Sequence, residues 1–370
     1  MKKIVGFIIN LFFSLFPVNK NKIIFQSGRN KIDSNPYAIY KYIKGQKEYN
    51  YKCIWLIEKN TDTSLVDKKD CFYYKSLVGL FHLATAKYWI RSQSIGSIVK
   101  KRKNQIYVQT WHGAGALKKC EYDCTNIPFD KRTPMEHTLD WDYLVTTDKK
   151  NDLVMRNCLG YTKETLLLGN AVTDLLINSD MNLDNLYKMY NITPNKKIIL
   201  YAPTFRDYEL DCDSNIGSSL LNRLKLPSDD YVLLLRLHPL VCNKIANMKL
   251  PKNFINVGDY PIIEHLMLIS DVLITDYSSI VFEYALLNRP IIFYPYDYDR
   301  YVEERGGFYI DYNTLPGSIC HNSEDIKEAL KDIKSYNLKY KNNIKSFNKE
   351  FNYLNDGHVC ERFVEVLKKI

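Results

Sequence analysis

The sequence lacks the cysteine spacing of a zinc site and shows no regular disulfide framework. Its nine cysteines are scattered over 370 residues without a C-x-x-C pair. The closest spacing, Cys120 and Cys124, has no second Cys or His pair that would complete a zinc site. An odd number of cysteines without a pattern is typical of free thiols in a reducing compartment. We therefore expect no disulfide, no metal and no cofactor.

Three widespread catalytic motifs are also missing. The chain contains no G-x-x-x-x-G-K-[ST], no G-x-G-x-x-G and no G-x-S-x-G. A P-loop kinase, a dinucleotide dehydrogenase and an α/β-hydrolase are therefore not supported. Nor does a zinc finger, an RNA-binding signature or an arginine-rich arm accompany the net charge of +9. We expect no nucleic acid as a partner, and the charge favours anionic lipid or a phosphate-bearing substrate.

The N-terminus, M-K-K-I-V-G-F-I-I-N-L-F-F-S-L-F-P-V, is too short to span a membrane. A spanning helix needs about 20 apolar residues, and no signal-peptide cleavage site follows. As a helix, the segment gathers its polar positions on one narrow stripe: Lys3, Gly6, Asn10 and Ser14. We predict that residues 1–20 form a helix lying in an anionic membrane surface. The alternative is a helix docked on the protein's own core. The run K-K-R-K at 100–103 is either a solvated loop or part of the same basic surface.

Beyond residue 20, short apolar runs alternate with helical patterns, which is typical of βαβ units and parallel sheets. The strands expected in the first half are Lys22–Gln26, Tyr51–Ile57, Cys71–Tyr74, Tyr88–Arg91, Gln105–Gln109, Tyr143–Thr146 and Thr165–Leu168. Those expected in the second half are Lys197–Tyr201, Tyr231–Leu237, Phe254–Val257, Val272–Thr275 and Pro290–Tyr294. The pattern predicts an α/β protein with two doubly wound domains that enclose a cleft. We place the domains at 21–175 and 176–342, with a C-terminal helical segment, 343–370, that packs on the second domain or crosses back to the first.

Four polar clusters follow expected strands, where a doubly wound sheet places its ligand site. They are T-W-H-G-A-G-A-L-K-K at 110–119, Y-A-P-T-F-R-D at 201–207, R-L-H-P at 236–239 and T-D-Y-S-S at 275–279. In the first cluster, Gly113 permits a close approach of the backbone to a ligand. The imidazole of His112 suits a general base. A histidine that only stabilises its loop is the alternative.

The other clusters suit phosphate binding. Arg236 and His238 alternate with leucines on an expected strand, so both side chains point to one face and suit a phosphate group. A structural arginine–carboxylate pair is the alternative. Ser278 and Ser279 stand where a helix is expected to begin, which is a natural anion site. Ordinary helix capping is again the alternative.

These motifs, in this order, resemble the CDP-glycerol glycerophosphotransferase family of teichoic acid synthesis. The likeness runs from about residue 105 to the C-terminus and includes R-P-I-I-F-Y-P-Y-D and N-D-G-H-V-C-E-R-F. It implies a GT-B fold of two Rossmann-like domains, with the nucleotide held mainly by the second. It also implies a peripheral enzyme on the cytoplasmic face of the membrane, acting on a lipid-linked acceptor, in which His112 and His238 are needed for activity. Ala114, Gly115 and Glu283 depart from the family's usual residues.

From this resemblance we expect an acceptor hydroxyl to attack the β-phosphorus of a CDP-polyol, with His112 as base and CMP as the leaving group. The acceptor would be an undecaprenyl-linked saccharide or polymer. The residues expected to hold the donor are Arg236, His238, Ser278, Ser279, Thr275, Asp276 and Arg206. The residues expected on the acceptor side are Gly113, Lys118 and Lys119. The alternatives are a GT-B glycosyltransferase that uses a nucleotide-sugar, and an inactive membrane scaffold. The identity of the polyol, glycerol or ribitol, stays open.

Overall fold

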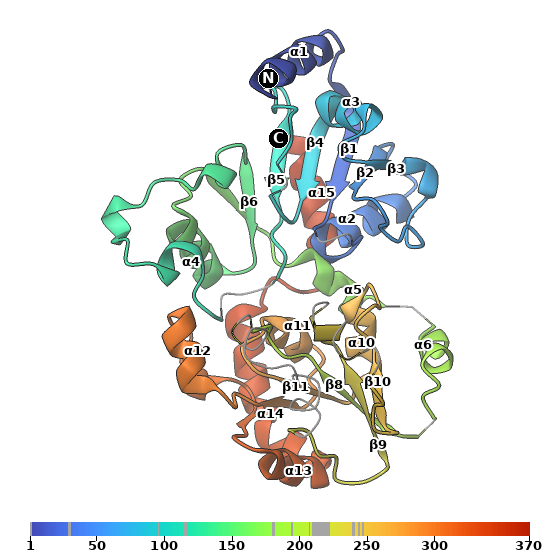
Figure 1. Cartoon of the computed structure of the whole chain (residues 1–370), viewed down its shortest axis with the longest axis vertical. Coiled ribbons are helices and arrows are strands. Elements are labelled where there is room, and N and C mark those ends of the chain that lie inside the picture. The colour runs from blue at the N-terminus through green and yellow to red at the C-terminus, as the bar shows by residue number, and fades with distance from the viewer. Residues whose placement is uncertain are drawn as a thin grey trace. The chain divides into compact units, whose positions relative to one another are not determined.

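The chain folds into two compact units, which Figure 1 shows in a computed structural model. The first unit comprises Met1–Gly113, Thr125–Leu175 and Leu354–Ile370, and the second comprises Ala114–Cys124 and Leu176–Tyr353. The structure describes residues 2–28, 31–94, 96–113, 117–179, 182–193, 195–206, 208, 223–238, 241–242, 245 and 248–370, with side chains from residue 6 onward.

One division between the units lies after Leu175, and two segments belong to a different unit from their neighbours in sequence. Residues 114–124 join the second unit, because Lys119 N donates to Gly307 O at 3.0 Å and Tyr309 N donates to Leu117 O at 2.9 Å. The C-terminal segment changes unit at Leu354 rather than at residue 343. Helix α14 (Ile333–Phe351) stays with the second unit, and only α15 (Val359–Lys369) packs on the first.

Within the described residues, the first unit holds a seven-stranded parallel sheet in the order β3-β2-β1-β4-β5-β6-β7. Its strands are β1 (Asn19–Gln26), β2 (Lys52–Ile57), β3 (Cys71–Tyr73), β4 (Ala86–Arg91), β5 (Ile106–Gln109), β6 (Tyr143–Thr146) and β7 (Glu164–Leu167). The order reverses between β1 and β4. Such a switch point is characteristic of doubly wound folds.

The second unit repeats this arrangement with a six-stranded parallel sheet in the order β10-β9-β8-β11-β12-β13, counted over the described residues. Its strands are β8 (Lys197–Tyr201), β9 (Tyr231–Leu235), β10 (Phe254–Asn256), β11 (Val272–Thr275), β12 (Ile291–Phe293) and β13 (Ser318–Ile319). Here the switch point lies between β8 and β11. The prediction of two Rossmann-like α/β domains is therefore confirmed.

Helices connect the strands of both units. Those of the first unit are α1 (Lys2–Ser14), α2 (Ser34–Gly45), α3 (Leu77–Thr85), α4 (Lys149–Leu159) and α15, with the short α5 (Asp174–Ile177) at the boundary. Within the described residues, those of the second are α6 (Asp184–Met189), α10 (Ile263–Ile269), α11 (Ile280–Ala285), α12 (Tyr298–Arg305), α13 (Ser323–Lys331) and α14. Their ends follow standard capping chemistry. Asp148 caps the first turn of α4, and Gly160 ends that helix in the left-handed region at φ 58°.

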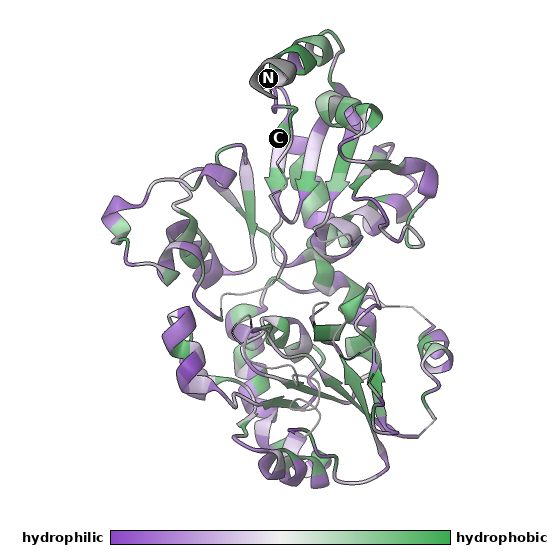
Figure 2. Cartoon of the chain, viewed as in Figure 1, coloured by the Kyte–Doolittle hydropathy of each residue, from purple (hydrophilic) through white to green (hydrophobic). Residues whose placement is uncertain are grey.

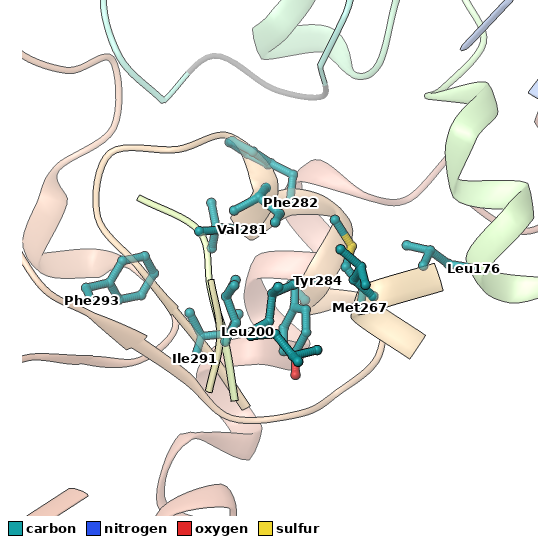
Figure 3. Packing of buried hydrophobic residues seen from close by; sticks show 14 of the residues in the cluster. Leu176, Leu200, Met267, Val281, Phe282, Tyr284, Ile291 and Phe293 are labelled. Carbon is teal, nitrogen blue, oxygen red and sulfur yellow. The ribbon is translucent and has the colours of Figure 1, made fainter. Parts of the chain in front are cut away.

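The central strands of the second sheet, β8, β9, β11 and β12, are buried on both faces. Leu200 and Ile291 belong to one buried cluster, and their neighbours in sequence, Ile199 and Ile292, belong to another. Figure 3 shows the first of these clusters, where Tyr284 packs with Leu200. Burial on both faces explains why these strands read as continuous apolar runs and not as alternating ones.

Candidate active site

The second sheet reverses its strand order between β8 and β11, and the residues that follow these two strands form one polar cluster. β8 ends at Tyr201 and β11 ends at Thr275, and the two strands are hydrogen-bonded neighbours. A doubly wound sheet opens its ligand-binding crevice at such a point, beyond the carboxyl ends of its strands. The motifs A-P-T-F-R and T-D-Y-S-S therefore meet where the fold favours a ligand.

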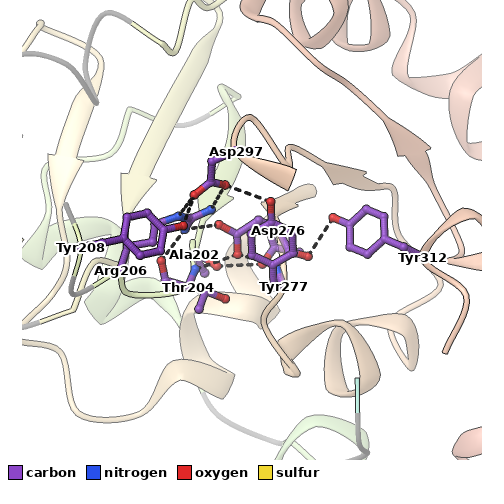
Figure 4. Close-up of polar contacts among 9 residues, drawn as sticks. Ala202, Thr204, Arg206, Tyr208, Asp276, Tyr277, Asp297 and Tyr312 are labelled. Carbon is purple, nitrogen blue, oxygen red and sulfur yellow. Dashed lines mark hydrogen bonds and ion pairs between the residues drawn. The ribbon is translucent and has the colours of Figure 1, made fainter. Parts of the chain in front are cut away.

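Arg206 lies at the centre of this cluster (Figure 4). Its Nη1 lies 2.6 Å from Oδ2 of Asp276, and its Nε and Nη2 each lie 2.8 Å from an oxygen of Asp297. The side chains of Arg206 and Asp276 are only 1% and 2% exposed. Leaving one such buried charge without its partner would cost about 3–5 kcal/mol. The three side chains therefore require one another.

Backbone groups and tyrosines complete the network. Asp276 accepts hydrogen bonds from Thr204 N at 2.8 Å and from Tyr277 N at 2.5 Å. The Tyr277 hydroxyl donates to Asp297 at 2.9 Å, and the Tyr208 hydroxyl donates to the same carboxylate. Figure 4 shows these groups converging on Arg206 and the two carboxylates.

The network holds Asp297 as a carboxylate and engages the side chains of Arg206 and Asp276, two of the residues predicted to bind the donor substrate. Burial by itself raises the pKa of Asp297, but the hydrogen bonds and the charge of Arg206 bring that pKa below its ordinary value. Thr275 is fully buried, and its Oγ1 donates to Ala202 O at 2.8 Å. The donor-binding roles of Arg206, Thr275 and Asp276 stay predictions. The observed contacts describe a frame that fixes the loop leading to Ser278.

Ser278 and Ser279 are partly exposed at the end of this frame. Ser279 is the residue before α11 and makes no capping hydrogen bond through its side chain. Ser278 Oγ accepts only a long hydrogen bond, 3.5 Å, from Ile280 N. Capping of α11 therefore does not account for the two adjacent serine hydroxyls. Their role in binding the donor substrate stays a prediction.

Arg236 does not lie on a strand, which corrects the expected strand Tyr231–Leu237. β9 ends at Leu235, because its neighbour β10 ends at the paired residue Asn256 and offers no further ladder. The Arg236 Nη1 then donates to three carbonyl oxygens, those of Val257 at 3.1 Å, Gly258 at 2.6 Å and Tyr260 at 2.7 Å. One nitrogen of the guanidinium therefore stabilises the turn after β10.

His238 has different neighbours from Arg236. Its ring stacks on Phe205, with centroids 4.2 Å apart and an interplanar angle of 28°. Phe205 precedes Arg206 in the A-P-T-F-R motif, so His238 faces the β8 side of β9 while Arg236 faces the β10 side. The two side chains therefore contact different segments, and a shared role at one phosphate stays a prediction. The requirement for His238 in activity stays a prediction.

His112 is exposed in the first unit, beyond the end of β5. Its Nδ1 lies 3.4 Å from Ser92 O, which follows β4. A carbonyl oxygen only accepts, so this contact is a hydrogen bond in the tautomer that carries the ring proton on Nδ1. The ring stacks on Trp111 with centroids 4.8 Å apart. This arrangement suits the base predicted from the sequence.

A row of buried polar residues, not identified from the sequence as functional, supports this loop. Gln26, Arg91 and Gln109 are paired in register across β1, β4 and β5, and none is more than 3% exposed. Gln109 Oε1 accepts a hydrogen bond from Trp111 N at 3.1 Å. Arg91 donates to the side chain of Gln26. Each is the last residue of an expected strand. This shared position is the feature of the sequence from which the row could have been predicted.

The three residues expected on the acceptor side do not stay together. Gly113 is the last residue of its segment of the first unit, whereas Lys118 and Lys119 belong to the second. Lys118 forms an antiparallel bridge with Phe308. Ala114 and Gly115, which depart from the family pattern, lie outside the described residues.

Metal-ligating residues show no clustering in the part of the chain that the structure describes. No group of three or more His, Cys, Asp or Glu side chains there could hold a metal ion. The cysteines of the described segments are free thiols.

Comparison with known proteins gives one consistent result. The sequence profile of the CDP-Glycerol:Poly(glycerophosphate) glycerophosphotransferase family matches residues 8–369. A teichoic acid poly(glycerol phosphate) polymerase of Bacillus spizizenii is 35% identical over 95% of this chain and 93% of its own length. One of Staphylococcus epidermidis is 33% identical over 95% of this chain, which spans only 51% of that relative. A variant of the wall teichoic acid polymerase TagF, soaked with CDPG, matches all of this chain and 93% of its own, with 28% identity and a TM-score of 0.83. The predicted GT-B fold is therefore confirmed.

Proposed function

This chain belongs to the CDP-Glycerol:Poly(glycerophosphate) glycerophosphotransferase family, as the sequence motifs predicted, and on that premise we propose the reaction that its residues carry out. The enzyme transfers glycerol phosphate, or a related polyol phosphate, from a CDP-polyol to a hydroxyl of a lipid-linked acceptor in teichoic acid synthesis. The observation that carries this proposal is the match over residues 8–369, which includes both predicted catalytic histidines.

The chemical step is a displacement at the β-phosphorus of the donor. The acceptor oxygen forms a bond to this phosphorus, and the bond between the phosphorus and the bridging oxygen breaks. CMP leaves with that electron pair, and the hydroxyl proton passes to Nε2 of His112. In the tautomer in which Nδ1 donates to Ser92 O, Nε2 is the ring nitrogen that carries the lone pair needed by a base. Reactions of this class depend mainly on positioning and on neutralising phosphate charge. Ser278, Ser279 and His238 are the proposed donor contacts.

The first measurement is CMP release by the purified protein. CDP-glycerol and CDP-ribitol are each supplied with and without a lipid-linked saccharide acceptor. Acceptor-dependent CMP from one donor establishes the reaction and names the polyol. The length of the product separates single addition from polymerisation. No CMP from either donor contradicts the proposal and leads to a panel of nucleotide-sugars.

Replacement of the proposed base gives a sharper test. We expect His112→Ala to abolish turnover while CDP-polyol affinity, measured by calorimetry, stays close to that of the wild type. Loss of a general base alone typically lowers the rate about 10²–10⁴-fold. His321→Ala is the control, because this exposed histidine follows β13 and is not part of the proposed site. If His112→Ala weakens donor binding as much as it lowers turnover, the assignment as base is wrong.

We further propose that α1 holds the enzyme at the cytoplasmic face of an anionic membrane. None of the helices in the described segments is long and apolar enough to cross a bilayer. The helix is docked on the first unit through its polar stripe, since Asn10 Nδ2 donates to Ile98 O and Asn10 Oδ1 accepts from Lys100 N, both at 2.8 Å. Arg102 Nη2 also donates to Phe13 O at 2.8 Å. The guanidinium of the K-K-R-K run therefore fixes the end of the helix.

The opposite side of α1 and the turn after it present apolar side chains to the solvent. Those exposed by 55–77% are Phe7, Ile8, Leu11, Phe12 and Leu15. Figure 2 shows the same part of α1 as hydrophobic. Leu77 and Val78, at the start of the contacting helix α3, are 74% and 50% exposed. A docked helix with its apolar side outward suits shallow insertion into a bilayer, and the net charge of +9 favours anionic lipid.

A further inference from the structure

Lys118 lies on a short segment that the chain contributes to the second unit. Residues 114–124 follow the W-H-G motif in sequence but belong to the unit that holds Asp276 and Ser278. The segment is fixed there by two backbone hydrogen bonds, Lys119 N to Gly307 O at 3.0 Å and Tyr309 N to Leu117 O at 2.9 Å. This position is at odds with the acceptor-side role expected from its place in the sequence.

The bridge determines where the Lys118 side chain points. The two hydrogen bonds flank Lys118 and Phe308, so these residues form a non-hydrogen-bonded antiparallel pair, whose side chains lie close together on one face. The Phe308 ring is 5.5 Å from the ring of Tyr277 and 6.0 Å from that of Tyr301. Tyr277 stands between Asp276 and Ser278. Lys118 is therefore directed toward the T-D-Y-S-S loop.

The Lys118 ammonium is surrounded by charges of both signs. Burial lowers the pKa of Lys118; attraction by Asp276 opposes this, and repulsion by Arg305 and Arg206 adds to it. Asp276 already forms an ion pair with Arg206. The Lys118 side chain makes no hydrogen bond or ion pair with any of the described residues. A partly buried cation in such surroundings is stabilised by an additional anion.

We propose that Lys118 binds the diphosphate of the donor next to the T-D-Y-S-S loop, and so belongs to the donor side of the reaction. This inference rests on the proposed function, because that function supplies a nucleoside diphosphate as the anion. The ammonium neutralises phosphate charge beside Ser278 and Ser279. The guanidinium of Arg206 is already bound by two carboxylates and is less free to bind phosphate. Lys118 therefore supplies the positive charge for the diphosphate.

The experiment is a calorimetric titration of CDP-glycerol, CDP and CMP into the full-length protein and its Lys118→Met and Lys118→Gln variants. We expect the affinity for CDP-glycerol and CDP to fall about 10-fold or more, as for loss of a charged hydrogen bond. Affinity for CMP should fall less, because CMP lacks the second phosphate. Lys345→Met is the matched control, since Lys345 is an exposed lysine of α14 in the same unit.

Two outcomes would overturn the inference without affecting the proposed function. The first is wild-type affinity for CDP-glycerol in both Lys118 variants. The second is unchanged donor affinity together with a raised KM for the lipid-linked acceptor, which would restore the acceptor-side role. Absence of CDP-glycerol binding to the wild-type protein would contradict both proposals. Gln keeps a polar side chain of intermediate length, so the test does not depend on the Met variant folding normally.

Discussion

Trp111 adopts a backbone conformation that residues other than glycine rarely adopt. Its φ is 57°, in the left-handed region, where a bulky residue costs about 1–2 kcal/mol. The adjacent contacts oppose this cost, since Gln109 Oε1 accepts from Trp111 N and the indole stacks on His112. Strain of this kind persists only where the surroundings enforce it, and it is frequent at functional sites. We infer that it orients the imidazole of His112.

Removal of the Gln109 amide tests this orientation. We expect Gln109→Leu, which keeps the approximate volume, to lower kcat roughly 10-fold or more, because small misplacement of a catalytic group is costly. The affinity for CDP-glycerol should not change. Gln26→Leu is the control, since it removes a buried amide from the same row without touching Trp111. Equal losses of kcat in both variants would show that the row acts only through stability.

The sequence singles out candidate site residues that stand in motifs, and it does not single out residues that act by holding other residues in place. His112 stands out because a histidine beside a glycine after a strand is a recognisable pattern for a ligand site. Ser278 stands out because it is one of two adjacent serines that follow a strand. Asp297 lies within the motif R-P-I-I-F-Y-P-Y-D, yet its role depends on the bond to Arg206 across a neighbouring loop. The shift of Lys118 to the second unit likewise follows from its pairing with Phe308. Such long-range partners are not encoded in local spacing.

At the scale of elements, the sequence predicts the interiors of the strands, whereas the ends of a strand depend on where the neighbouring strands of the sheet end. The ranges Tyr143–Thr146, Lys197–Tyr201 and Val272–Thr275 are those observed, because central parallel strands are continuous apolar runs. β9 stops two residues early, although Leu237 continues the apolar pattern, because its partner β10 stops at Asn256. β13 was missed because Ser318–Ile319 is too short to form a pattern.

Helix α1 illustrates how one element combines two alternatives that the sequence left open. It docks on the first unit, where Phe13 is buried against the ring of Phe81 at 6.2 Å, and it also exposes an apolar side. The polar stripe is not uniformly solvated, because Asn10 is used for docking. Docking therefore fixes the direction of the exposed side chains instead of removing them from the surface.

A charge placed on this side should prevent membrane binding and leave the fold intact. We expect Leu11→Lys, at a side chain that is 58% exposed, to reduce flotation with anionic phospholipid vesicles several-fold, because a charged group opposes apolar insertion. Leu338→Lys is the matched control, since Leu338 is 72% exposed on α14 of the other unit. Flotation of Leu11→Lys at the wild-type level would contradict the role of α1. CMP release with a soluble acceptor analogue should be similar in all three proteins.

At the scale of the whole molecule, the chain passes between the two units more than once, and its C-terminus completes the first. Asp174 accepts hydrogen bonds from Val359 N at 3.2 Å and Cys360 N at 2.7 Å, which fixes the beginning of α15. Phe363 of this helix is only 2% exposed. All four tryptophans, at positions 55, 89, 111 and 141, belong to the first unit. Tryptophan fluorescence therefore reports on the unfolding of that unit alone.

This distribution allows the stability of each unit to be measured separately within the intact protein. We expect Phe363→Ala to lower the urea midpoint of tryptophan fluorescence, since truncating a buried phenylalanine costs about 3–5 kcal/mol. Phe347→Ala is the matched variant, because Phe347 is 5% exposed on α14 and packs on Phe282 in the second unit. It should shift the midpoint of far-UV circular dichroism and leave the fluorescence midpoint nearly unchanged. Coincident shifts of both signals in both variants would contradict independent unfolding, and would show that the segments exchanged between the units couple them into one cooperative structure.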